Sequence, residues 1–305
     1  MKKVIVLLVV LCVTSMASAT YDWRGPAYTT PGTQDWFTAT NWGGTPGGVP
    51  AIAATSPTGI RTYGSSNYDT SLTTCPIIAN GDARAYEVRV GSASPTAPAY
   101  LVMNSGTLKT TNFLMIGADS TTNNGRAGAV YMHGGTMTLG GATADGLDNG
   151  SRTSGHLYVG CGVTGNAAIV PTGFLSMDGG FIDAGGDFAI GKNNTSGQVY
   201  LNGDAIIKAN DLKMRPDYSA TMNLASAYMD ISGNAMVIIN GNKTANISNW
   251  VGLNWITANG GDSTVNYQYY TTGQYAGKTV ISAVPEPTTI CLVGLGALSM
   301  LRRKK

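Results

Sequence analysis

A group of ionisable residues in the second half of the chain is the strongest candidate for acid–base catalysis. Three aspartates lie close together with two lysines near them, at Asp178, Asp183, Asp187, Lys192 and Lys208. A glycosidase needs two carboxylates that face each other, and a lyase usually needs a calcium cluster plus a basic residue. Residues four apart share one face of an unbroken strand, but a Gly-Gly pair between the last two aspartates predicts a turn. We therefore expect most of these aspartates to be turn formers.

Histidine and cysteine give little support for catalysis or transition-metal binding. Of the two histidines, His133 takes a turn position where similar segments carry Asn or Asp, and His156 begins a strand. Neither belongs to a recognisable Ser-His-Asp arrangement, and no Cys-x-x-Cys or His-x-x-x-His pattern occurs. Cys75 and Cys161 could pair in an exported protein, but a single pair is no disulfide framework.

Calcium is the one ion with a candidate segment, Asp145-Gly-Leu-Asp148-Asn-Gly, which lies in a predicted loop. This segment lacks the alternating Asp/Asn positions that precede glycine in a calcium loop. The Gly-Gly-x-Gly-x-Asp repeat of calcium-binding β-helices is absent as well. We therefore expect no cofactor, no metal and no catalytic residue.

The composition favours strands and turns. Charged residues make up 12% of the chain, glycine occupies 41 of 305 positions, and only Glu87 and Glu286 are glutamates. A helical bundle, a coiled coil or a doubly wound α/β enzyme rarely does without Glu and Lys. Without the six cations of the two ends, 13 basic residues face 17 acidic ones, so no basic footprint for nucleic acid remains.

Residues 1–19 have the pattern of a secretory signal peptide. Two lysines precede the apolar run 4–13, and small residues at Ala17 and Ala19 mark a site for signal peptidase after Ala19. A membrane anchor is the alternative, but this run is shorter than the ~20 residues that a spanning helix needs. Cys12 raises a lipoprotein as a second alternative, and Leu11 stands where a small residue would be expected.

The C-terminus combines three parts in a fixed order. Pro285, Glu286 and Pro287 form an extended stretch that cannot join a helix. The apolar segment 289–301 follows as a short membrane helix, and Arg302-Arg303-Lys304-Lys305 would stay on the cytoplasmic side. The body of the protein is therefore expected outside the cytoplasm, although a tail anchor without processing is the alternative.

These three parts resemble a PEP-CTERM sorting signal over residues 284–305. The resemblance implies a bacterial exported protein that an exosortase recognises through Pro285-Glu286-Pro287 and the basic residues Arg302 and Arg303. It also implies removal of the tail, a transient anchor in the inner membrane and a link to exopolysaccharide and biofilm. The signal does not fix the function of residues 20–283.

Similar segments recur through the body of the chain. They begin Leu101-Val-Met-Asn, Val130-Tyr-Met-His, Leu175-Ser-Met-Asp and Val199-Tyr-Leu-Asn, with a weaker fifth at Met222-Asn-Leu-Ala. Each alternates apolar and polar residues, continues into a turn, and is followed by a second short apolar strand. The shared apolar positions are Met103, Met132, Met177, Leu201 and Leu224.

Stacking of such units predicts an all-β fold, a single-stranded right-handed parallel β-helix. The spacings of 24 and 23 residues suit one coil, and the larger spacings of 29 and 45 predict insertions at 118–127 and 143–155. An antiparallel β-sandwich is the alternative, because its strands also recur at short intervals. We expect the repeats over 86–270 and a linker over 271–283.

A segment rich in tryptophan and proline, 20–85, precedes the repeats. Its stretch Asp35-Trp-Phe-Thr-Ala-Thr-Asn-Trp-Gly-Gly resembles the start of secreted β-helix and autotransporter-type passenger proteins. Trp36 and Trp42 are predicted to cap the open end of the stack, with glycan stacking as the alternative. Trp250, Trp255 and the run starting at Tyr267 are predicted to cap the other end.

The sequence thus predicts a non-catalytic component of the cell surface or extracellular matrix. Its expected partners are signal peptidase, exosortase, the membrane and an extracellular polysaccharide, and nucleic acid is not among them. The rival prediction is a polysaccharide-binding or polysaccharide-degrading β-helix protein, a lyase or a glycosidase. Convergence of Asp183, Asp187 and Lys208 in one groove would favour that rival.

Overall fold

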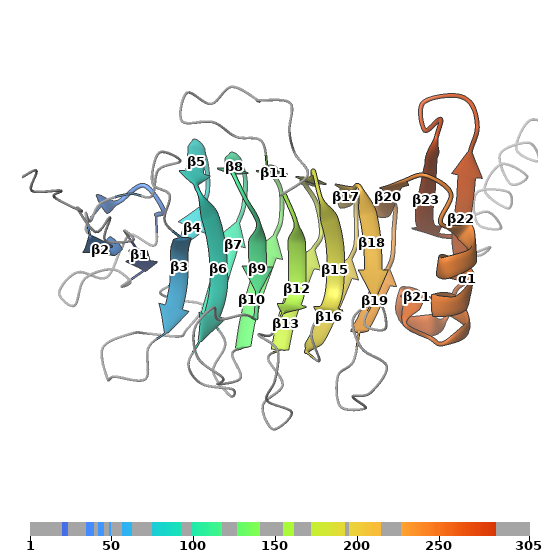
Figure 1. Ribbon diagram of the computed structural model, residues 1–305, viewed down its shortest axis with the longest axis horizontal. Helices are drawn as coiled ribbons and strands as arrows, with labels where there is room; N and C mark the ends of the chain where they lie inside the picture. Colours follow the sequence, from blue (N-terminus) through green and yellow to red (C-terminus); the bar gives the residue numbers. More distant parts are fainter. Residues whose placement is uncertain are drawn as a thin grey trace, which may run out of the picture.

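A computed structural model describes residues 20–23, 35–39, 42–45, 49, 57–62, 75–92, 99–117, 127–140, 155–161, 172–192, 195–214 and 227–284. These residues form an all-β protein with one α-helix and three sheets, which we name A, B and C (Figure 1). The signal segment 1–19, Asp145, Asp148 and residues 285–305 lie outside the described residues.

The described strands are divided among the three sheets as follows. Sheet A holds β1 (Thr20–Trp23), β2 (Trp42–Thr45), β3 (Pro57–Thr62), β6 (Glu87–Ser92), β9 (Leu114–Ile116), β12 (Leu157–Cys161), β15 (Asp187–Lys192) and β18 (Asp211–Met214). Sheet B holds β4 (Ile77–Ile78), β7 (Ala99–Met103), β10 (Ala127–Met132), β13 (Thr172–Met177), β16 (Ser196–Leu201), β19 (Ala227–Ile231) and β21 (Ile256–Ala258). Sheet C holds β5 (Asp82–Ala85), β8 (Thr107–Thr110), β11 (Thr136–Leu139), β14 (Phe181–Ala184), β17 (Ile206–Ala209), β20 (Met236–Asn240), β23 (Lys278–Ala283) and β22 (Val265–Tyr270).

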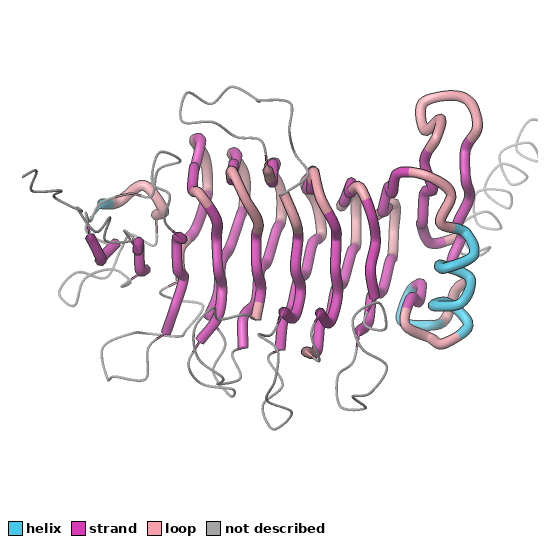
Figure 2. The backbone as a smooth tube through the Cα atoms, viewed as in Figure 1, coloured by secondary structure: helices cyan, strands magenta, loops and turns pink. Residues whose placement is uncertain are grey.

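Successive strands of the chain belong to the three sheets in a regular cycle. From β4 to β18, consecutive strands belong to sheets B, C and A in turn, and neighbours within a sheet are three strands apart in sequence. Figure 2 shows the resulting rows of strands side by side. Antiparallel pairs among the described strands occur only towards the ends, in β1–β2, β20–β23 and β22–β23. The alternative of an antiparallel β-sandwich is therefore wrong.

The register of sheet B confirms the alignment of four repeats. Met103 pairs with Met132, Met132 with Met177, and Met177 with Leu201. The fifth member of this row is Ile231, whereas Leu224 lies outside the described residues. The segment beginning at Met236 forms β20 in sheet C.

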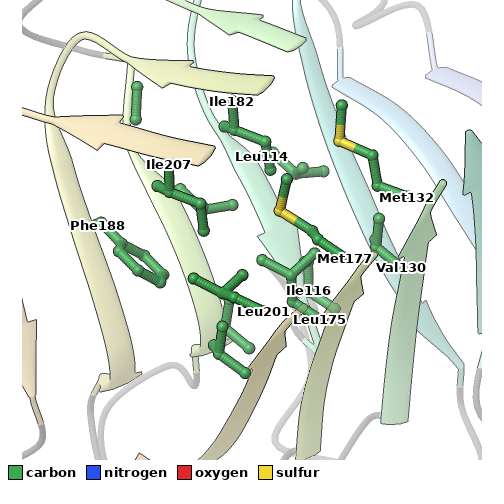
Figure 3. Close-up of a cluster of buried hydrophobic side chains, with 14 of the residues drawn as sticks. Leu114, Ile116, Val130, Met132, Leu175, Met177, Ile182, Phe188, Leu201 and Ile207 are labelled. Carbon is green, nitrogen blue, oxygen red and sulfur yellow. The ribbon is translucent and has the colours of Figure 1, made fainter. Parts of the chain in front are cut away.

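Alternation of side chains along the strands gives all three sheets a common core. Leu114 and Phe188 from sheet A, Met132 from sheet B and Ile182 and Ile207 from sheet C belong to one buried cluster. Figure 3 shows these side chains pointing toward one another from the surrounding strands. Burial of this apolar surface is the main contribution to the stability of the fold.

The C-terminal end of the strand rows carries a small capping unit. Helix α1 (Thr244–Gly252) buries Ile247 and Trp250, and Trp255 and Tyr267 pack against the same core. The prediction that residues 271–283 form a linker is wrong over much of that segment. Its second half is β23, which pairs with β20 on one side and β22 on the other.

Candidate functional site

The structure separates the acidic residues that a polysaccharide-cleaving enzyme would need. Asp183 lies on β14 in sheet C, where its carboxylate is 3.3 Å from Lys208 Nζ. Asp187 lies on β15 in sheet A, beyond the Gly-Gly turn, and its carboxylate is 2.7 Å from Lys213 Nζ. The three residues Asp183, Asp187 and Lys208 therefore do not form one group, because the two carboxylates belong to different sheets.

Asp178 and His133 occupy equivalent turns, as their sequence positions predicted. The backbone N–H of His133 donates to Met103, and that of Asp178 donates to Met132. His133 Nδ1 lies 2.9 Å from an Asp178 carboxylate oxygen, and both side chains are about half exposed. We name this row of turn residues the turn ladder: Asn104, His133, Asp178 and Asn202.

His156 lies in a partly buried ionic and aromatic cluster on the outer face of sheet A, the face opposite the core. Its Nδ1 accepts a 2.9 Å hydrogen bond from the backbone N–H of Asp187, and its ring stacks on Tyr158 with centroids 5.2 Å apart. Lys192 Nζ lies 4.1 Å from the centroid of the Tyr158 ring. Burial lowers the pKa of His156, the Asp187 carboxylate opposes this shift, and Lys192 and Lys213 reinforce it.

This environment predicts an acid sensitivity with a definite sign. Because the folded pKa of His156 is below the unfolded value of about 6.5, the unfolded chain binds the proton more strongly. The stability that the neutral ring contributes is present above the unfolded pKa and is lost as the pH falls through the folded pKa. We expect His156→Gln to make the free energy of unfolding less dependent on pH between about 7.5 and 5. Denaturant titrations at several pH values measure this dependence. An equal change of the free energy of unfolding with pH in the wild type and the variant would contradict the prediction.

Trp36 and Trp42 are both buried, Trp42 on β2 of sheet A and Trp36 against β4 of sheet B. Their exposed fractions are 0% and 4%, and their ring centroids lie 4.7 Å apart in an edge-to-face contact. The backbone N–H of Trp36 donates to Ile77 in β4, and Trp42 Nε1 donates to the Trp36 carbonyl oxygen. Stacking on a sugar needs an exposed ring face, so the predicted glycan-stacking role of these two residues is inconsistent with the structure. Their position agrees with a cap.

Cys75 and Cys161 are both buried and are not joined by a disulfide. Burial raises the pKa of each thiol to about 11, so neither is a ready thiolate at neutral pH. Within the described ranges, no group of three His, Cys, Asp or Glu residues could hold a metal ion.

An aromatic ladder on the outer face of sheet B was not predicted from the sequence. Its five rings come from five successive strands of the sheet: Tyr100, Tyr131, Phe174, Tyr200 and Tyr228. Successive ring centroids are 6.2, 5.7, 5.5 and 5.7 Å apart, which is the contact range of aromatic pairs. The rings are partly exposed, and Tyr200 has an exposed fraction of 37%.

The rings alternate between two columns of outward-facing residues. In β7, β10, β13, β16 and β19, one column contains Tyr100, Ala129, Phe174, Gln198 and Tyr228. The other contains Val102, Tyr131, Ser176, Tyr200 and Asp230. The aromatic side chains therefore form a zigzag along the direction in which the strands stack.

Comparison with known proteins assigns the C-terminal segment. Residues 283–305 match the family described as the PEP-CTERM protein-sorting motif. This match supports an exported protein that is targeted by exosortase to the cell envelope or surface. No curated protein and no solved structure matches the chain.

The sorting motif begins at the end of the last described strand. Strand β23 ends at Ala283, and the Val284 N–H still donates to the Thr264 carbonyl oxygen at 3.0 Å. None of the helices in the described part of the chain is long and apolar enough to cross a membrane. The predicted membrane helix 289–301 lies outside that part.

Proposed function

We propose that this chain is an exported, non-catalytic component of the cell surface or extracellular matrix, associated with exopolysaccharide. Its body would be a right-handed parallel β-helix, held transiently in the inner membrane by the C-terminal helix until exosortase removes the tail. The observation that carries the proposal is the PEP-CTERM motif at 283–305, which begins at the final residue of β23, the last described strand of a capped, repetitive β body.

The strand order supports the β-helix part of the proposal. Three strands per repeat, parallel neighbours three strands apart and one core common to the three sheets are the features of stacked coils. A repetitive body of this kind presents long, regular outer faces and suits a scaffold.

Pairing of the ionisable side chains supports a non-catalytic role. On sheet A, Glu87 pairs with Arg89, and Asp187 pairs with Lys213. On sheet C, Asp183 pairs with Lys208. A catalytic carboxylate pair needs two such groups facing one substrate. Reproducible depolymerisation of a polysaccharide by the purified protein would contradict this part of the proposal and favour a lyase or a glycosidase.

Processing of the tail tests the sorting part of the proposal. We expect the mature protein in the envelope or medium to end upstream of the apolar segment 289–301, because the exosortase would cut near Pro285-Glu286-Pro287. Intact-mass spectrometry of the exported protein measures the C-terminus directly. A variant with Glu286→Ala and both flanking prolines changed to Ala is expected to keep its tail, with signal peptide removal after Ala19 as the internal control. Recovery of surface protein that still ends at Lys305 would refute processing.

A further inference from the structure

We propose that the aromatic ladder of sheet B is a binding track for a linear, uncharged polysaccharide that lies along the direction of strand stacking. This inference rests on the proposed association with exopolysaccharide and gives that association a site and a ligand class. The site consists of Tyr100, Tyr131, Phe174, Tyr200 and Tyr228, with Ser176 and Gln198 between the rings.

The geometry of the ladder fits an extended chain. Neighbouring strands are about 4.8 Å apart, so five successive strands carry the rings over a path several sugar units long. The zigzag places consecutive rings in alternate columns, with centroids 5.5 to 6.2 Å apart. A globular ligand would contact one or two rings, whereas a linear polymer can contact all five at once.

The chemistry of the rings fits the apolar faces of sugars. The face of an aromatic ring is negative, and it attracts the weakly positive C–H groups that a pyranose exposes on one face. Each tyrosine adds a hydroxyl group at the edge of its ring, and Ser176 and Gln198 add hydrogen-bonding groups in the same columns. Sugars with alternating C–H and O–H surfaces are suited to such an amphipathic strip.

The charge distribution indicates an uncharged ligand. Asp230 is the only ionisable acid or base among the non-tyrosine residues of the two columns, and it is buried. Its carboxylate accepts hydrogen bonds from Thr257 Oγ1 at 2.6 Å and the Gly260 N–H at 2.9 Å. Nucleic acid and acidic polysaccharide need cations beside the stacking rings, and neither column contains a lysine or an arginine.

The other two faces provide a contrast within the same molecule. Sheets A and C carry cross-strand ion pairs on their outer faces, including Asp187 with Lys213 and Asp183 with Lys208. The turn ladder beside sheet B contributes His133 and Asp178, whose side chains lie 2.9 Å apart. The aromatic face is therefore the part of the described surface best suited to a neutral polymer.

Binding of neutral glucan oligosaccharides to the full-length protein in detergent tests the proposal. The test variant carries Tyr131→Ala and Tyr200→Ala. The matched control is Tyr270→Ala, because Tyr270 makes an edge-to-face contact with Tyr275 outside the ladder. Loss of two stacking contacts should weaken binding at least about tenfold, a change of ~1.4 kcal/mol. The Tyr270→Ala variant should bind like the wild type. A second variant, Tyr131→Phe with Tyr200→Phe, keeps the rings and is expected to retain most of the binding.

The outcomes separate the site from the proposed function. Unchanged glucan affinity in the double Ala variant, with circular dichroism like that of the wild type, would overturn the ladder as the site but leave the association intact. A wild-type protein that binds no glucan, mannan or galactan oligosaccharide would overturn both. Preference for a polyuronate over neutral oligosaccharides would overturn the assignment of an uncharged ligand.

Discussion

The Gly173→Ala variant is expected to lose about 3 kcal/mol of folding free energy or more, or to fail to fold. Gly173 in β13 of sheet B packs directly against the backbone of Gly160 in β12 of sheet A. A Cβ atom at Gly173 would lie 2.0 Å from Gly160 N and 2.5 Å from the Ile116 carbonyl oxygen. Backbone atoms cannot move aside as a flexible side chain can, so the two sheets would have to separate at this corner.

Gly252→Ala is the matched control for this prediction. Gly252 is the last residue of α1, and a Cβ atom there would have no atom within 4 Å. Alanine in place of glycine in a helix is neutral or stabilising by up to about 1 kcal/mol. Denaturant unfolding of both variants measures the difference. Equal stability of Gly173→Ala and the wild type would show that sheets A and B do not meet at this corner.

Phe188→Ala is expected to destabilise the fold by about 3 to 5 kcal/mol. Phe188 has an exposed fraction of 0% and lies in sheet A between Leu157 and Leu212 in the register. Its ring points into the core beside side chains of the other two sheets (Figure 3). Removal of the ring therefore leaves a cavity that neighbours on several strands would have to fill, and cores relax only partly.

Phe181→Ala removes the same side chain from a half-buried position on β14. We expect this control to cost about 1 kcal/mol, because solvent can occupy the space that the ring leaves. The free energies of unfolding from denaturant titration compare the two variants. A loss at Phe188 no larger than that at Phe181 would contradict a core common to the three sheets.

Turn chemistry explains why four repeats could be aligned from the sequence and the fifth could not. Strand alternation and glycine-containing turns both marked Met103, Met132, Met177 and Leu201. In the last repeat, the turn that stacks on Gly203 contains Gly233, and both glycines have positive φ. Leu224 has a similar apolar pattern but is followed by Ala-Ser-Ala, which has no glycine. The position of the glycine turn therefore predicts the alignment better than the apolar pattern does, and it identifies Ile231 as the fifth aligned residue.

The ion pairs and the aromatic ladder depend on the register between neighbouring strands, which could not be predicted from the sequence. Asp187 was grouped with Lys192 and Lys208, but its salt-bridge partner is Lys213, one repeat further along the chain. The aromatic ladder was missed because its rings alternate between the third and the first residue before the aligned apolar position. A search of both outward positions in every repeat would have found an aromatic residue in each.

Parts of the candidate site could be predicted and parts could not. The prediction that His133 and Asp178 occupy equivalent turns is confirmed. It could be made because polar residues of similar type recur at this turn position in each repeat. Burial of Trp36 and Trp42 was not decided by the sequence, since a cap and a sugar platform both use tryptophan. Which of the two applies depends on whether the rings face the core, and only the packed structure determines that.

Formation of a disulfide across two repeats is the most direct test of the stacked strands. Thr138 and Asp183 are 45 residues apart in sequence but are register partners in β11 and β14, where neighbouring strands are about 4.8 Å apart. Thr138→Cys with Asp183→Cys should therefore oxidise to a disulfide within one chain. Thr138→Cys with Lys208→Cys should not, because Lys208 is one strand further away, about twice that spacing and beyond the ~7 Å limit for Cα atoms. A non-reducing gel with peptide mass spectrometry distinguishes the two variants, and a bridge in the second variant but not in the first would contradict the stack.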